Sequence, residues 1–164
     1  MADTKIKEAA QRQQISEVTV NKATEKLDKV LTFYIKGQIY GVEIDYVTEI
    51  IGIQPFTKVP GTPNFLKGII NVRSKAVPVI EVRTRFGKEE IAYTDRTCII
   101  IVTYNDMMIG LIVDGVKGVH DVLKDIVSQT PIFDEVNTSR YIKYIIREND
   151  EVRLILDLEK FLED

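Results

Sequence analysis

The chain has 164 residues, 45% of them hydrophobic, a formal net charge of −3 and a single cysteine. This length suits one domain or two small lobes with a shared core, and the lack of a basic stripe argues against a nucleic-acid groove. No apolar run approaches the roughly 18 residues of a membrane span, the polar start is not a signal peptide, and one cysteine cannot form an intrachain disulfide, so we expect a cytoplasmic protein.

The first 29 residues differ in composition from the rest of the chain. They carry six Lys or Arg and five Asp or Glu with only scattered aliphatic residues, and every Tyr and Phe lies at Phe33 or later. Such a segment cannot bury enough apolar surface to offset the entropy lost on ordering, so we predict a mobile N-terminal tail over 1–29. A weak amphipathic helix is the alternative for this segment.

From residue 30 onward, short Ile- and Val-rich segments alternate with turn residues, which is typical of an all-β chain of closely spaced strands. In segment 31–36 the apolar residues occupy every second position, as in a half-buried strand. The further predicted strands are 39–44, 68–72, 76–82, 97–104, 107–113, 141–147 and 151–157, and short helices are predicted over 83–86 and 158–163. Pro78 has no N–H to donate to a sheet, so it predicts an edge strand or a barrel corner.

The sequence also repeats itself. GVEIDYVTEI at 41–50 aligns without a gap with GLIVDGVKGV at 110–119, with three identical positions and three aliphatic exchanges. FLKGIINVRSKAVPVIEVRTRF at 65–86 aligns with YIKYIIRENDEVRLILDLEKFL at 141–162, with 11 of 22 positions identical or similar. Two matches in the same order indicate an internal duplication. We therefore predict two copies of one β unit, packed as two small barrels with a groove between them.

Comparison of the two copies separates positions that serve the fold from positions that do not. Aliphatic residues occur at the same place in both copies, as in the pairs Val47/Val116 and Ile70/Ile146. Some charged residues occur in the first copy only, and among them Glu49 aligns with Gly118 and Arg73 aligns with Asn149. The architecture does not require these charges, so Glu49 and Arg73 are the first candidates for a working surface.

Residues suited to catalysis or metal binding are few. The one histidine, His120, stands beside Asp121 and could act as a base, but a partly exposed histidine at a strand end is the more common case. Cys98 begins an apolar run and is interpreted as a small buried hydrophobe rather than a reactive thiol. The glycines around Asp114 match no phosphate-binding loop, and Ser74 lies in no nucleophile motif. We therefore predict no enzymatic activity, no cofactor and no metal site.

Half a dozen motifs appear together in a characteristic order: FYIKGQIYGVEIDYVTEI, VPGTPNFLKGIINVR, PVIEVRTRFG, IIIV, GLIVDGV, and finally YIK with LDLEKFL. In this order the chain resembles the CheW family of bacterial chemotaxis coupling proteins, from about residue 30 to the C-terminus. The resemblance implies a CheW-like domain over 30–164 built from two intertwined five-stranded SH3-like barrels with short helices. The first barrel unit then covers about 37–95 and the second about 97–163, with strand 30–36 crossing over to complete the second lobe.

The resemblance also implies a role and partners. Similar proteins are adaptors in chemotaxis signal transduction, and they bind the cytoplasmic signalling tip of chemoreceptors (methyl-accepting chemotaxis proteins). They also bind the regulatory domain of the histidine kinase CheA. A cytoplasmic protein recruited to membrane receptor arrays, without direct membrane insertion, is therefore expected.

The family's functional motifs can be placed on this sequence. Its VxEI motif falls on Val47, Glu49 and Ile50, and its NLRG motif falls on Asn71, Val72, Arg73 and Ser74. The valine, glutamate and arginine are associated with coupling in the family, which makes Val47, Glu49 and Arg73 the predicted receptor-binding residues. Ile50 and Val59 are predicted to contribute to an apolar kinase-facing patch, with core packing as the alternative.

One position departs from the family pattern. The glycine that follows the arginine in the family is Ser74 here, and Lys75 comes next. If this position needs a positive φ, serine costs about 1 kcal/mol, by analogy with other strained positions. The hairpin then either is strained or uses another turn type, and a shift of Arg73 would follow. This departure keeps open a CheW-like adaptor in a different kinase signalling pathway.

Overall fold

The computed structural model describes residues 26–123, 127–128 and 136–163. The chain divides into two units, residues 29–120 with 128–164, and residues 1–28 with 121–127. Of the second unit the structure describes only 26–28, 121–123 and 127, so the account below concerns the first unit. The first 25 residues of the predicted tail lie outside the described residues, and its last four residues, 26–29, belong to strand β1, which begins at Lys26.

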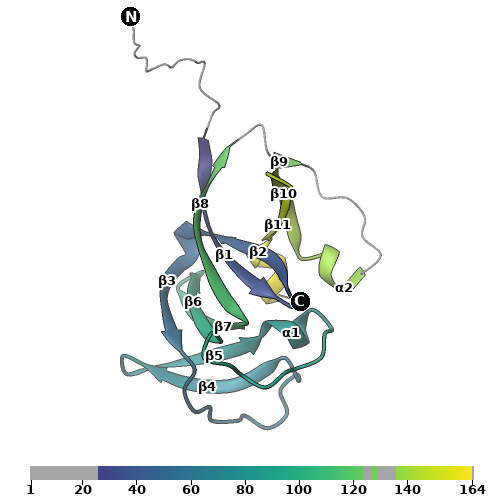
Figure 1. The fold of residues 1–164 in the computed structure, drawn as a ribbon. Coiled ribbons are helices and arrows are strands. Elements are labelled where there is room, and N and C mark those ends of the chain that lie inside the picture. The colour runs from purple at the N-terminus through teal and green to yellow at the C-terminus, as the bar shows by residue number, and fades with distance from the viewer. Residues whose placement is uncertain (1–25, 124–126, 129–135, 164) are drawn as a thin grey trace, which may run out of the picture. The chain divides into compact units, whose positions relative to one another are not determined.

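The described residues form short strands joined by tight turns (Figure 1). The elements are β1 (Lys26–Ile35), β2 (Gln38–Glu43), η1 (Ile44–Tyr46), β3 (Val47–Gly52), β4 (Leu66–Val72), β5 (Lys75–Glu81), α1 (Val82–Arg85), β6 (Cys98–Tyr104), β7 (Met107–Val113), β8 (Gly115–Leu123), β9 (Val127–Ser128), α2 (Val136–Ser139), β10 (Ile142–Glu148), β11 (Glu151–Leu156) and α3 (Leu158–Glu163). The predicted all-β class is confirmed.

The strands form two sheets that exchange their first hairpins. One sheet has six strands in the order β8-β1-β2-β11-β10-β9, and the other has five in the order β3-β6-β7-β5-β4. The β1–β2 hairpin thus lies with the C-terminal strands, and the β6–β7 hairpin lies with the N-terminal ones (Figure 1). The exchange is larger than predicted, because β2 crosses over as well as β1 and because β6–β7 crosses in return. The predicted unit boundaries at 37 and 97 therefore do not follow the sheets, and one sheet has a sixth, two-residue strand.

The registers of the two sheets show that the duplication extends to single residues. β2 runs parallel to β11 with Gly41 opposite Ile155, and β7 runs parallel to β5 with Gly110 opposite Val79. These pairs are equivalent in the repeat alignment. A methyl group at Gly41 would lie 2.6 Å from Cδ1 of Ile155, and one at Gly110 would lie 2.8 Å from Cγ2 of Ile99. The two glycines therefore occur in both copies because the crossing strands leave no room for a side chain.

We expect Gly110→Ala to lower the free energy of unfolding by about 1–3 kcal/mol, the usual cost of overpacking a core. Gly41→Ala should cost less, because the terminal Cδ1 of Ile155 can rotate away while Cγ2 of the β-branched Ile99 cannot. Urea unfolding of both variants measures the difference. Equal losses would show that the two crossings are packed alike.

The five-stranded sheet closes on itself through the segment after β3. Thr57 and Ile69 exchange two backbone hydrogen bonds of 2.8 and 2.9 Å, which join this segment to β4 at the other end of the strand order. Its interior contains the aliphatic side chains of one core cluster. These are Ile70, Val72, Val77, Val79, Ile99, Ile101 and Ile112. A second, larger cluster combines aliphatic side chains from both sheets with five aromatic ones, which are Phe33, Tyr40, Phe86, Tyr141 and Phe161.

Of the two alternatives predicted for Pro78, the edge strand is wrong, because β5 lies between β4 and β7. The parallel pairing of β5 with β7 covers only Val79 to Glu81, so Pro78 precedes the first residue that needs a donor on that side. On its other side it is paired in register with Ile69 of β4. A proline is therefore tolerated inside the sheet at the point where two strands begin to pair.

Candidate functional site

Among the described residues, the four two-residue hairpin turns share one pattern of φ angles. The turn residues are Lys36–Gly37, Arg73–Ser74, Asn105–Asp106 and Asn149–Asp150, and φ is positive at each of these eight residues. Positive φ at both central residues is the pattern of a type I′ turn, which favours Gly, Asn and Asp. Only the second turn carries Arg (φ 52°) and Ser (φ 68°), so its sequence does not suit its conformation.

Serine at position 74, where the family has glycine, therefore strains the turn and does not change the turn type. The side chain of Asn71 supports the tip: its Oδ1 accepts a hydrogen bond of 3.1 Å from the Ser74 N–H. Asn71 belongs to the family motif, but sequence reasoning gave it no role. It bonds to the backbone of the turn itself, so it holds Arg73 in the displayed position.

We expect Ser74→Gly to raise the free energy of unfolding by about 0.5–1 kcal/mol, because glycine adopts positive φ without steric cost. Asp150→Gly at the equivalent turn is the matched control and should gain only a few tenths of this, because Asp tolerates the left-handed conformation. The midpoint of urea unfolding measures both. An equal gain in the two variants would show that the Arg73–Ser74 tip is not specially strained.

The turn brings Arg73 close to Glu49, and neither residue has a charged counterpart in the second copy. Nη2 of Arg73 lies 3.2 Å from Oε1 of Glu49 on β3, and the Arg73 side chain is 79% exposed while that of Glu49 is 21% exposed. The pair therefore lies at the protein surface and not in the packed interior.

This ion pair is weak in energetic terms and is easily opened. Exposed ion pairs contribute about 0–1 kcal/mol, so Arg73 can leave Glu49 for another carboxylate at little cost. The second oxygen of Glu49, Oε2, is shielded from solvent and accepts no hydrogen bond from the described residues. A buried acceptor without a donor costs about 1–3 kcal/mol, so Glu49 gains if a rotation lets it accept from an incoming donor.

The other predicted residues lie near the pair or on the following loop. Val47 is half-buried and packs against the larger core cluster, and half-buried and exposed residues alternate along β3 despite a register shift between Val47 and Glu49. Ile50 is 45% exposed, so the alternative of core packing is excluded for it. Val59 is half-buried in the loop between β3 and β4. We call Val47, Glu49 and Arg73 the β3 surface.

The structure shows the surroundings of three residues for which the sequence predicted no functional role: Asp114, Cys98 and His120. The carboxylate of Asp114 accepts hydrogen bonds from Nε and Nη2 of Arg83 at 2.9 and 2.7 Å, and a third from the backbone N–H of Lys36 at 2.8 Å. Burial raises the pKa of the half-buried Cys98 thiol, as expected of an unreactive cysteine. Burial lowers the pKa of His120, and the charges of Arg153 and Lys117 lower it further.

Two further features are absent from the part of the chain that the structure describes. Within residues 26–123, 127–128 and 136–163 no three His, Cys, Asp or Glu side chains gather to hold a metal ion. Across these same ranges no helix is long and apolar enough to span a membrane.

Comparisons with known proteins agree with this architecture. The chain matches the model of the CheW-like domain over residues 29–164. It is 31% identical to the chemotaxis protein CheW of Bacillus subtilis over 136 residues, which cover 83% of this chain and 87% of that protein. It is 29% identical to the chemotaxis protein CheW of Klebsiella aerogenes over 132 residues, with 80% of each chain covered.

A solved structure is also similar. The crystal structure of the scaffolding protein TtCheW from Thermoanaerobacter tengcongensis matches with a TM-score of 0.77 and 31% sequence identity, and the match covers 84% of this chain and 93% of that one. The family match covers far more than half of the sequence and includes both sheets, the exchanged hairpins and the β3 surface. The chain therefore belongs to the CheW-like domain family.

Proposed function

We propose that this protein is a chemotaxis adaptor, which couples the cytoplasmic tip of a chemoreceptor to the regulatory domain of the histidine kinase CheA and catalyses no reaction itself. Its family membership, relatives named chemotaxis proteins and a structural neighbour described as a scaffold support this role. The observation that carries the proposal is the exposed Glu49–Arg73 ion pair, which occupies a place where the second copy has Gly118 and Asn149.

In the proposed mechanism the receptor binds at the β3 surface. A receptor helix presents a carboxylate or its C-terminal carbonyl groups to Arg73, whose planar guanidinium offers several donors at once. Glu49 then turns toward a donor of the receptor, which satisfies the oxygen that has no partner among the described residues. The half-buried Val47 supplies an apolar contact beside this exchange of polar partners.

The kinase contact is proposed for the outward side of the same lobe, at Ile50 and Val59. Ile50 is one of four large hydrophobic side chains that are exposed among the described residues. An adaptor that holds two partners raises their effective concentration for each other, and it transmits a change at one contact as a coupling free energy of about 1–3 kcal/mol. Modest individual affinities are sufficient for this function.

Co-sedimentation tests the proposal. We expect the CheA regulatory domain to sediment with a receptor signalling fragment only when this protein is present. In the proposal the receptor fragment and the kinase domain each contact this protein and do not contact each other. The Arg147→Glu variant, which changes an exposed charge on β10, serves as a control and should assemble normally. Equal sedimentation of the kinase domain with and without the protein would exclude the adaptor function.

The alternative of an adaptor for a different kinase pathway depended on a displaced Arg73. The structure has the same turn conformation at Arg73–Ser74 as at the other three hairpins. The turn type is therefore unchanged at Ser74, and the same sedimentation experiment, which uses chemotaxis partners, decides between the two adaptor functions.

A further inference from the structure

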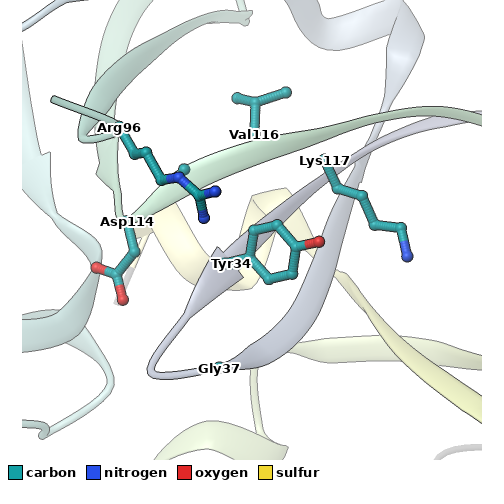
Figure 2. Close-up of a pocket in the computed structure, with 7 residues that line it drawn as sticks. Tyr34, Gly37, Arg96, Asp114, Val116 and Lys117 are labelled. Atoms are coloured by element: carbon teal, nitrogen blue, oxygen red, sulfur yellow. The ribbon is translucent and has the colours of Figure 1, made fainter.

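A pocket of about 620 Å³ opens in the second copy of the repeat, outside the β3 surface. It is lined by Tyr34, Gly37, Arg96, Asp114, Gly115, Val116 and Lys117 (Figure 2). The residues come from β1, the turn after it, the segment before β6, and the start of β8. We call it the Arg96 pocket. In the view of Figure 2 the Tyr34 ring lies between the Arg96 guanidinium and the Lys117 ammonium group.

The pocket is open because one side chain is missing. In the repeat alignment Gly115 stands where the first copy has Tyr46, whose ring packs against Tyr104 with centroids 6.1 Å apart. A methyl group added at Gly115 would meet its nearest atom, Cβ of Arg96, at an ordinary 3.6 Å, and the backbone φ of Gly115 is not positive. Neither packing nor backbone conformation requires glycine here, so the space needs another explanation.

Only one of the charged groups that line the pocket is unpaired among the described residues. The carboxylate of Asp114 is neutralised by two hydrogen bonds from Arg83, and the ammonium group of Lys117 lies 2.6 Å from Oε1 of Glu151. Arg96 is exposed, and in the described part of the chain its guanidinium has neither an ion pair nor a hydrogen bond. The pocket therefore contains one uncompensated positive charge with several N–H donors.

We propose that the Arg96 pocket binds the carboxylate of an acidic side chain of a protein partner. A guanidinium and a carboxylate form two parallel hydrogen bonds, and a single unpaired cation matches a single negative charge. The hydroxyl of Tyr34 is a further donor, and Val116 contacts the methylene groups of the entering side chain. The assignment of the carboxylate to a protein rests on the proposed adaptor function. One test therefore measures whether the pocket binds a carboxylate, and another measures whether that carboxylate comes from a partner of the adaptor.

A titration of the isotope-labelled full chain tests the pocket without any partner. The probe is N-acetyl-glutamate N-methylamide, and the corresponding glutamine compound is its neutral control. We expect saturable shifts at the Gly115 and Lys117 amides and at Nε of Arg96 with the glutamate probe only. Gly115→Tyr and Arg96→Ala should abolish these shifts, while Arg147→Ala should retain them. No shifts in the unmodified protein, or tighter binding of inorganic phosphate than of the probe, overturns the proposal.

The affinity for each partner then tests whether the carboxylate belongs to a partner protein, which we call the protein source. We expect Arg96→Glu and Gly115→Tyr each to weaken binding to the receptor fragment or the kinase domain about tenfold, whereas Arg147→Glu does not. If Arg73→Glu weakens binding while neither pocket variant affects either partner, the protein source is overturned and the adaptor function stands. If the unmodified protein binds neither partner, the adaptor function and the protein source both fail, and the probe titration alone decides whether the pocket binds carboxylates.

Discussion

Arg73→Glu should weaken binding to the receptor signalling fragment by about 2 kcal/mol, which is about 30-fold, while the free energy of unfolding changes by less than about 1 kcal/mol. The fold depends little on Arg73, because its side chain is 79% exposed and its only ion pair in the described part of the chain is at the surface. The receptor contact depends on it more, because the reversed charge repels the same carboxylates that Arg73 attracts. Calorimetric titration and urea unfolding measure the two quantities.

A charge exchange separates a role in binding from a role in the fold. The double variant Glu49→Arg with Arg73→Glu rebuilds an ion pair of opposite direction between β3 and the turn. If the ion pair serves only to hold the turn against β3, this double variant should bind the receptor fragment as tightly as the unmodified protein. If the partner recognises each charge, the double variant should bind no better than Arg73→Glu alone. The second result is expected, and full recovery of affinity would remove Arg73 from the receptor site.

Asp114→Ala should lower the free energy of unfolding by about 3–5 kcal/mol, the largest stability change predicted for this protein. Arg83 is only 7% exposed, and its hydrogen bonds to the Asp114 carboxylate raise the pKa of its guanidinium. Removal of the carboxylate leaves a buried charge without its main partner and frees the N–H of Lys36 at the adjoining turn. Since domains are stable by about 5–15 kcal/mol, this loss is a large fraction of the total.

The repeat provides the control for this prediction. Asp45 is the equivalent residue of the first copy, and it is exposed, so Asp45→Ala should change stability by less than about 0.5 kcal/mol. Arg83→Met combined with Asp114→Ala should recover part of the loss, because no buried charge is then left alone. Equal small losses in Asp45→Ala and Asp114→Ala would show that the buried pair contributes little. Urea unfolding of the four proteins gives all the free energies.

The local features of the fold could be predicted because they depend on short segments. Apolar runs bounded by turn residues identified eight of the strands, and α3 lies at 158–163 as predicted. The strands β3 and β8 and the two-residue β9 were missed by pattern alone. The side chains of β3 and β8 alternate between half-buried and exposed over most of their length, and Lys117 and the glycine Gly118 interrupt the apolar pattern of β8. Strands that expose one side give a weak sequence signal.

Features that depend on distant segments could not be predicted from the sequence. The alignment showed that Glu49 and Arg73 belong to one copy only, but nothing in it placed them 3.2 Å apart. The same alignment contained the pair Tyr46 and Gly115, yet the pocket depends on the segment before β6, which has no counterpart in the repeat. The pairing of Arg83 with Asp114 was missed for the same reason, since the two residues are far apart in the chain.

The exchanged hairpins have a consequence for how this chain can be divided. A fragment that ends at residue 95 retains β3, β4 and β5 but lacks β6 and β7, the two strands that lie between β3 and β5 in their sheet. Its complement, in turn, lacks the β1–β2 ribbon that separates β8 from β11. Neither half is a self-sufficient folding unit, so severed halves should regain native structure only by reassociating. Denaturation of the intact chain should then be all-or-none, and a ligand bound to one lobe protects both.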